Sequence, residues 1–319
     1  MVTPPRFPLI QAPTPCHPLA RLGAELGLDL WIKRDDLTGF AAGGNKGRKL
    51  EYLIADALAH HAETVITCGA AQSNFVRQLG AAGAMTGIRV EAVLMDLPYD
   101  HGKRVTEPCA AHGGNRVLNQ WVGVIEHHHP DGTWDELFAL TADLAAQRRR
   151  EGRNVMEIPV GGSSALGAFA FAQAAEEVRL GGWDAIVVPT SSGSTHTGLA
   201  YALQGHTRIV GIACDPEPEM PDDLADLAGR LDDLTGLGRR LNADDFEYHL
   251  IAVGSGYGVA SPGSRAAIQR VAQTEGIFLD PIYSGKAMDG LIQLTSAGEL
   301  RGRVLFWHTG GLPTLWATP

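Results

Sequence analysis

Short apolar runs alternate with helical patterns along most of this chain, and this alternation limits the folds available to it. The apolar runs predict strands at residues 30–33, 64–68, 90–95, 155–158, 185–188, 209–214 and 304–307. Between them, helical patterns predict helices at residues 49–61, 74–86, 167–180 and 199–203. Strands that alternate with helices form parallel sheets covered by helices. The predicted fold class is therefore α/β with largely parallel sheets.

Length and charge narrow the functional classes. The 319 residues suffice for two domains or one large α/β unit. The net charge of −10 disfavours nucleic acid and anionic membranes as partners. The first ten residues do not resemble a signal peptide, and the apolar runs are shorter than a membrane span. We therefore expect a cytoplasmic protein with no nucleic-acid or membrane partner.

Cysteines and histidines carry little functional signal. No two of the four cysteines are spaced as CxxC, so free thiols are expected at Cys16, Cys68, Cys109 and Cys214. The adjacent residues His127, His128 and His129 cannot easily meet one ion, so we expect a solvated loop there and no metal site. His308 ends an apolar strand and is expected in the core or in a pocket wall.

A lysine follows two glycines at the first of three strand-to-helix junctions. The segment reads Gly43-Gly44-Asn45-Lys46, and glycines let the backbone approach a ligand closely. Lys46 lies at or near a helix N-terminus, where the helix dipole disfavours a cation. The same field lowers the pKa of the amine and favours its neutral, nucleophilic form. A surface lysine in a turn is the alternative.

The other two junctions are rich in hydroxyl and amide side chains. In the second, Ser73 and Asn74 are expected to cap the following helix, whose N-terminus could bind a carboxylate. In the third, Thr190–Thr195 contains five hydroxyl residues and one glycine, which predicts a cradle for a phosphate. It lacks the lysine of a Walker loop, which argues against a nucleoside triphosphate. A flexible polar loop is the alternative.

Taken together, these motifs resemble the fold-type II enzymes that use pyridoxal 5′-phosphate, and most closely the family of 1-aminocyclopropane-1-carboxylate deaminase and D-cysteine desulfhydrase. The similar segments follow the family order over nearly the whole chain: residues 31–36, 43–51, 72–74, 190–198, 279–286 and 308–311. The resemblance implies a tryptophan synthase β-like fold of two open twisted α/β domains, with the cofactor in the cleft between them. Residues 1–46 and 161–319 would form the larger domain, and residues 47–160 the smaller inserted one. A homodimer is also implied.

The resemblance assigns cofactor contacts residue by residue. Lys46 would form the Schiff base with the cofactor and carry the Cα proton, and Lys49 would reach the phosphate. Asn74 would bond the ring hydroxyl, and Ser284 would contact the pyridine nitrogen. The remaining phosphate contacts would come from Ser192, Gly193, Ser194 and Thr195.

The same resemblance assigns the substrate side of the site. Ser73 would hold the carboxylate of a small amino acid, and Tyr257 and Tyr283 are candidates for acid–base work. Two residues depart from the family pattern. Phe75 follows the motif Gln72-Ser73-Asn74, at a position where histidine or glutamine is usual in the family. Gly47 stands where threonine is usual. Phe75 removes a polar contact beside the carboxylate site, so a bulkier or more apolar β-substituent could fit.

Ser284 bears on the reaction. Deaminases of the cyclopropane substrate have glutamate at this position, and a carboxylate keeps the pyridine nitrogen protonated and strengthens the electron sink. A neutral serine implies a weaker sink, which suffices when the β-group leaves easily. We therefore predict α,β-elimination of the D-cysteine desulfhydrase kind, giving pyruvate, ammonia and the leaving group. Cyclopropane ring opening, L-cysteate sulfo-lyase activity and, more remotely, non-catalytic binding of a phosphometabolite are the alternatives.

Overall fold

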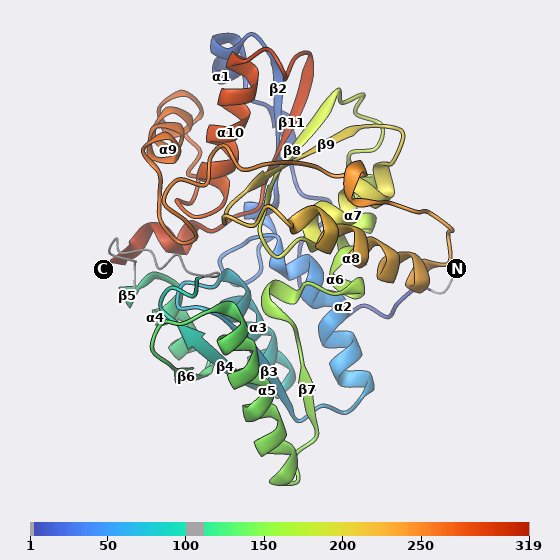
Figure 1. Cartoon of the computed structure of the whole chain (residues 1–319), viewed down its shortest axis with the longest axis vertical. Coiled ribbons are helices and arrows are strands. Elements are labelled where there is room, and N and C mark those ends of the chain that lie inside the picture. The colour runs from blue at the N-terminus through green and yellow to red at the C-terminus, as the bar shows by residue number, and fades with distance from the viewer. Residues whose placement is uncertain (1–2, 100–111, 319) are drawn as a thin grey trace.

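The computed structural model describes residues 3–99 and 112–318 (Figure 1). Two sheets lie one above the other in that view. The upper sheet has six strands, in the order β1 (Cys16–Pro18), β2 (Asp29–Arg34), β11 (Arg303–His308), β8 (Ala185–Thr190), β9 (Arg208–Ala213) and β10 (Glu247–His249). The lower sheet has four, in the order β6 (Ile125–His128), β4 (Arg89–Met95), β3 (Thr64–Ala70) and β7 (Val155–Glu157). A short pair joins β12 (Ala317–Thr318) to β5 (His112–Gly113).

Helices cover both sheets. The α-helices are α1 (Ala20–Leu26), α2 (Lys46–Ala59), α3 (Asn74–Thr86), α4 (Gly114–Trp121), α5 (Trp134–Arg150), α6 (Ala165–Ala174), α7 (Ser194–Leu203), α8 (Met220–Thr235), α9 (Pro262–Glu275) and α10 (Ser284–Ser296). Single 3-10 turns are η1 (Asp35–Leu37), η2 (Val160–Gly162), η3 (Ala175–Glu177), η4 (Ala243–Asp245) and η5 (Leu312–Trp316). Within the two large sheets every strand pair is parallel except β1 with β2, which confirms the predicted α/β class.

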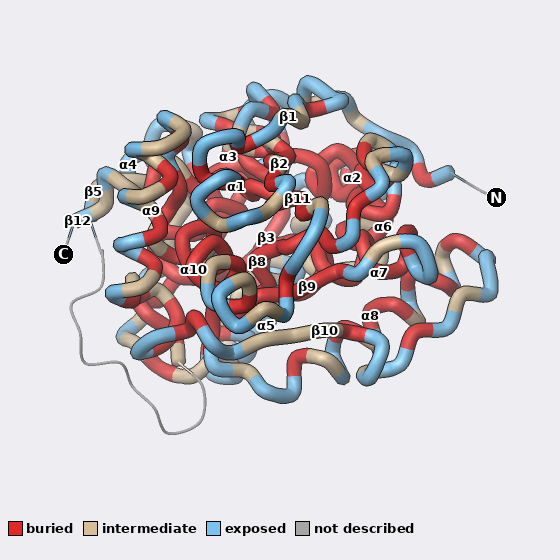
Figure 2. Tube along the Cα trace, turned by 90° about the horizontal axis from the view of Figure 1, so that it is seen from above, coloured by how far each residue is buried: buried red, intermediate tan, exposed pale blue. Residues whose placement is uncertain are grey.

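The central strands of the upper sheet are apolar because both of their faces are covered. Ile186 and Val188 of β8 belong to a cluster with α6, α7 and α8, whereas Ala185 and Val187 belong to a cluster with α1, α9 and α10. Figure 2 shows β8, β9 and β11 buried at the centre of the molecule. A strand covered on both faces reads as a continuous apolar run, and this is the pattern in the sequence.

Some predicted boundaries were wrong near polar residues. Helix α2 begins at Lys46 rather than residue 49, and α7 begins at Ser194 rather than residue 199. The polar first turns of these helices lack the apolar periodicity on which the prediction relied. His127 and His128 end strand β6 instead of lying in a loop, where they contact Glu91 and Glu126.

Three other predictions concern the cysteines, membrane-spanning helices and domain boundaries. Cys16, Cys68 and Cys214 are free, while Cys109 lies outside the described residues. No described helix combines the length and the hydropathy needed to cross a bilayer. The domain boundaries at residues 47 and 160 remain a prediction.

Candidate active site

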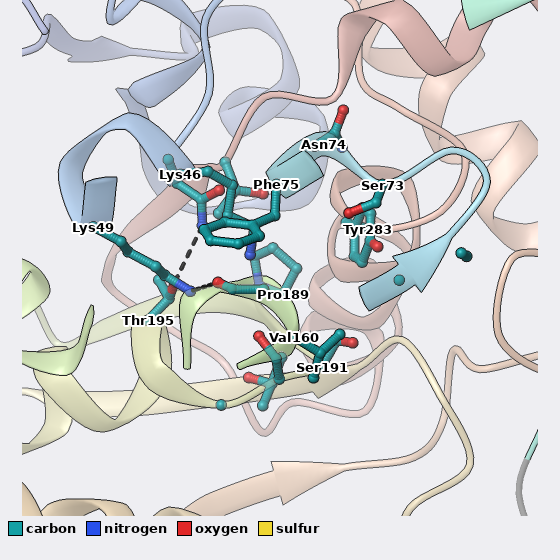
Figure 3. Close-up of a pocket in the computed structure, with 18 of the residues that line it drawn as sticks. Lys46, Lys49, Ser73, Asn74, Phe75, Val160, Pro189, Ser191, Thr195 and Tyr283 are labelled. Carbon is teal, nitrogen blue, oxygen red and sulfur yellow. Dashed lines mark hydrogen bonds between the residues drawn. The ribbon is translucent and has the colours of Figure 1, made fainter. Parts of the chain in front are cut away.

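The first turn of α2 presents Lys46 to a pocket between the two sheets (Figure 3). The preceding turn needs glycine, since Gly43 and Gly44 have φ of +71° and +118°. A Cβ on Gly43 would lie 1.9 Å from the carbonyl oxygen of Asp36. Burial lowers the pKa of Lys46 and favours the neutral amine. The direction agrees with the sequence prediction, but the cause is loss of solvent rather than the helix dipole on which that prediction relied.

Lys49 lies one helical turn after Lys46 and enters the same pocket. Its side chain is buried, and its Nζ donates to the carbonyl oxygen of Gly161 at 3.0 Å. Burial and the neighbouring Lys46 lower the pKa of Lys49 well below its usual value. Among the described residues, neither lysine forms an ion pair with a carboxylate. Two amines without an acid make this part of the pocket a favourable place for an anion.

The hydroxyl-rich segment after β8 forms another wall. Ser192, Gly193 and Thr195 line the pocket, and Gly193 is the N-cap of α7 with φ of +87°. Ser194 lies behind this surface, where its buried Oγ has no hydrogen-bond partner among the described residues. The N-terminus of α7, with Ser192, Gly193 and Thr195 at the pocket surface, thus presents the positive end of its helix dipole to the pocket that Lys49 also lines.

Ser163 supports this segment and was missed from the sequence. Its hydroxyl contacts the carbonyl oxygen of Ser192 and accepts a hydrogen bond from the backbone N of Ser194. Gly161, which precedes it, also touches the site. A Cβ there would lie 2.4 Å from the Ser192 Oγ and 3.7 Å from the Lys46 Nζ. The glycine pair Gly161-Gly162 after a predicted strand was the available signal.

Ser73 and Asn74 line the side of the pocket formed by α3. Ser73 is the N-cap, and its Oγ accepts a hydrogen bond from the backbone N of Val76 at 3.3 Å, as predicted. Asn74 instead begins the helix, and its Oδ1 accepts from Arg77 at 2.8 Å and Asn115 at 2.9 Å. This arrangement leaves the amide N–H groups of Asn74 as the donors available to a ligand.

Arg77 holds Asn74 in place and was also missed. It is buried, and its guanidinium contacts the neutral side chains of Asn74 and Asn115 and the carbonyl oxygen of Gly43. Burial lowers the pKa of Arg77 to about 10. Because Arg77 binds both the glycine turn and Asn74, it fixes the α2 side of the pocket relative to the α3 side.

Two tyrosines meet on the wall opposite the lysines. The Oη atoms of Tyr257 and Tyr283 are 2.5 Å apart, which places the two predicted residues together. Burial raises the pKa of both hydroxyls, so they stay protonated at neutral pH. Trp134 of α5 packs against Tyr257 with ring centroids 5.6 Å apart and also lines the pocket. It comes from a region without a recognisable motif and was not predicted.

The two departures from the family pattern have local explanations. The ring of Phe75 lines the pocket but is almost fully buried in the apolar cluster beneath α2 and α3. A Cβ at Gly47 would lie 2.5 Å from Cγ2 of Ile10. The N-terminal segment therefore occupies the space that a threonine side chain at residue 47 would need.

Ser284 is fully buried and does not line the pocket surface. Its Oγ donates to Oδ1 of Asp280 at 2.6 Å and accepts from the Asp280 backbone N at 2.8 Å. The Asp280 carboxylate also accepts from the backbone N of Ile282 and Tyr283, each at 2.9 Å. A hydroxyl that donates to a carboxylate offers only lone pairs to another partner. Ser284 is therefore not an isolated neutral group, and its identity alone does not separate elimination from ring opening.

The two-sheet fold and the lysine pocket define a class of protein, the fold-type II enzymes that use pyridoxal 5′-phosphate. The chain belongs to the family of pyridoxal-phosphate dependent enzymes, whose sequence pattern matches residues 8–310.

Named relatives cover almost the whole chain. D-cysteine desulfhydrase of Serratia proteamaculans is 39% identical over 335 residues, spanning 98% of this chain and 96% of that protein. D-cysteine desulfhydrase of Salmonella choleraesuis is 38% identical over 328 residues, which also span 98% of this chain and 96% of that protein. A solved structure described as an ACC deaminase homologue matches with a TM-score of 0.88 and 35% identity, over 98% of this chain and 94% of that one. The structure of an O-ureido-L-serine synthase matches with a TM-score of 0.65 and 17% identity, over 95% of this chain and 90% of that one. At this identity the match shows a shared fold alone.

The pocket suits this cofactor chemically. Its phosphate would be held by Lys49 and by Ser192, Gly193 and Thr195 at the start of α7, beside two buried amines that form no ion pair with a carboxylate among the described residues. Its aldehyde needs an amine, and Lys46 supplies one whose neutral form is favoured.

Proposed function

We propose that this enzyme catalyses α,β-elimination on a small β-substituted amino acid, in the manner of a D-cysteine desulfhydrase. Two full-length relatives with that name, at 38–39% identity, are the observation that carries the proposal. The cofactor, when bound through Lys46, would supply the electron sink that acidifies the Cα proton. The products would be pyruvate, ammonia and the β-substituent.

The pocket residues suit the proton transfers and the binding of the substrate carboxylate that this reaction requires. Lys46, whose pKa is lowered by burial, would accept the Cα proton of the bound substrate. Ser73 and the amide of Asn74 would hold the carboxylate at the N-terminus of α3. The tyrosine pair, whose hydroxyl pKa values are raised by burial, would donate a proton toward the leaving group.

Ring opening of 1-aminocyclopropane-1-carboxylate is the second candidate. The structural match to the ACC deaminase homologue favours it, as does the carboxylate of Asp280 behind Ser284. Ring opening gives 2-oxobutanoate, whereas elimination from cysteine gives pyruvate, so the two are told apart by product.

The decisive experiment loads the protein with pyridoxal 5′-phosphate and measures its absorbance and products. The loaded enzyme should absorb in the visible range, and Lys46→Ala should lose that band. Lys49→Met should need more cofactor for saturation but keep the band. The loaded wild type is then given D- and L-cysteine, cysteate and the cyclopropane amino acid. A loaded enzyme that forms no pyruvate from any cysteine-like substrate would refute the proposed reaction.

The homodimer implied by the resemblance remains a prediction, which sedimentation of the loaded enzyme would test.

A further inference from the structure

A second, larger cavity adjoins the candidate active site. It is a groove of about 570 Å³ that opens to solvent. Five residues line both it and the lysine pocket: Trp134, Val160, Ser191, Ser192 and Gly193. The groove thus begins where the pocket ends, and its size lies in the range of roughly 300–1,000 Å³ typical of small-molecule sites.

The groove lies at the far end of the pocket from the proposed carboxylate site. Figure 3 shows Asn74 and Ser73 on one side of the pocket and Val160 and Ser191 on the other. Ser192 and Gly193 at this junction are assigned to the cofactor phosphate, so a β-substituent would reach the groove past Trp134 and Val160, which line both cavities.

The floor of the groove is apolar. Phe138 of α5, which is 43% exposed, packs against Trp134 with ring centroids 6.0 Å apart. From the other side, Met220, Leu224 and Leu227 of α8 present their side chains. A Cβ on Gly193 would lie 2.8 Å from Cδ2 of Leu224, so this floor reaches the hydroxyl segment of the active site. An aromatic group entering from the pocket would be in contact with apolar side chains on both faces.

The rim of the groove is acidic. Among the described residues that line the groove, the carboxylates at its rim are those of Asp135, Glu217, Glu219 and Asp223, and the one guanidinium is that of Arg230. Asp215 also lines the groove but is buried and accepts a hydrogen bond from Ser191. Arg230 already lies 3.0 Å from Asp226. The field at the groove therefore opposes an anionic group and favours a neutral or cationic one.

We propose that the groove binds the β-substituent of the substrate, so that the enzyme cleaves S-substituted cysteines whose substituent is bulky and apolar or cationic. This inference rests on the proposed function. The Cα–H and Cβ–S bonds break, and the sulfur leaves as a thiolate with the electron pair of the Cβ–S bond. The thiolate takes up a proton, and hydrolysis of the remaining three-carbon enamine by one water gives pyruvate and ammonium.

The test uses the cofactor-loaded full chain and a matched substrate series. The substrates are the D and L forms of cysteine, S-benzylcysteine, S-(4-aminomethylbenzyl)cysteine and S-(4-carboxybenzyl)cysteine, with pyruvate and free thiol measured together. The neutral and cationic benzyl substrates should be cleaved. The cationic one should have a kcat/KM roughly tenfold above the anionic one at low salt, with the ratio shrinking as salt screens the rim.

Groove variants separate this site from the catalytic machinery. Phe138→Ala should lower kcat/KM for S-benzylcysteine by roughly fivefold. The kcat/KM of this variant for D-cysteine should stay within about twofold of the wild-type value. Asp223→Lys should reduce the preference for the cationic substrate. Asp233→Lys, an exposed change about 15 Å farther along the same helix and outside the groove, is the matched control and should leave that preference unchanged.

The outcomes are distinguishable. Turnover of cysteine with none of the benzyl substrates would overturn the groove assignment and leave the proposed function intact. Turnover of benzyl substrates that neither Phe138→Ala nor Asp223→Lys affects would overturn it as well. Failure to form pyruvate from every substrate in the series would overturn the proposed function itself.

Discussion

Replacing Asp35 with asparagine should destabilise the protein by removing one charge from a buried network beneath α2. The Asp35 carboxylate is inaccessible to solvent and accepts two hydrogen bonds from Arg48, at 2.8 and 2.9 Å. Thr14 and Trp307 donate to it as well, each at 2.8 Å. Arg48 lies between Lys46 and Lys49 on the helix that carries both active-site lysines. The network therefore holds the first turn of α2 on the six-stranded sheet.

The expected loss in the free energy of unfolding follows from the Arg48 charge, which loses its Asp35 partner and stays buried. Removing one partner of a buried ion pair costs about 3–5 kcal/mol, because the other charge stays buried. Arg48 would keep Glu177, whose carboxylate lies 2.7 Å from its Nη1, so we expect the lower end, about 3 kcal/mol. Such a loss is a large share of a typical stability of roughly 5–15 kcal/mol.

Urea unfolding at one fixed, saturating concentration of cofactor would measure this loss, since bound ligand itself adds stability. Asp56→Asn is the control on the same helix. Asp56 lies 3.2 Å from the exposed His60, and such surface pairs contribute about 0–1 kcal/mol. If Asp35→Asn were no more destabilising than Asp56→Asn, the network would not be what anchors α2.

Three further predictions concern other parts of the molecule. Burial opposes ionisation of Glu91, but hydrogen bonds from Arg148 and His127 outweigh it and lower its pKa to about 2. Its contribution to stability should therefore be complete above about pH 4.5 and vanish as the pH falls toward 2, so thermal melts of wild type and Glu91→Gln should converge over that range. Gly161→Ala should weaken cofactor binding, measured by spectral titration, because a Cβ at this φ of +63° would lie 2.4 Å from the Ser192 Oγ; equal affinity would contradict this. Asp280→Asn should free the Ser284 proton and shift the visible band of the loaded enzyme, and an unshifted band would show that Asp280 does not act on the cofactor ring.

Features encoded in short stretches were predictable from the chain. The alternation of apolar runs and helical patterns indicated a parallel α/β fold, because strands covered on both faces must be apolar along their length. The glycine turn before Lys46 was readable because only glycine adopts its backbone angles without strain. Ser73 was predicted as an N-cap because its position before an apolar helix is a local signal. Helix starts within polar segments, as at Ser194, were not predicted, because their first turns carry no apolar periodicity.

The sequence by itself determined the fold class, the glycine turn before Lys46, and the hydroxyl-rich segment at residues 190–195. Only the tertiary structure decided which distant groups surround them. Trp134 reaches the pocket from α5, although nothing in its neighbourhood marks it as a site residue. Asp280 backs Ser284, so a hydroxyl that reads as neutral is hydrogen-bonded to a charge. Periodicity and turn chemistry report on neighbours within a few residues of one another, whereas these contacts depend on how helices and strands far apart in the chain pack.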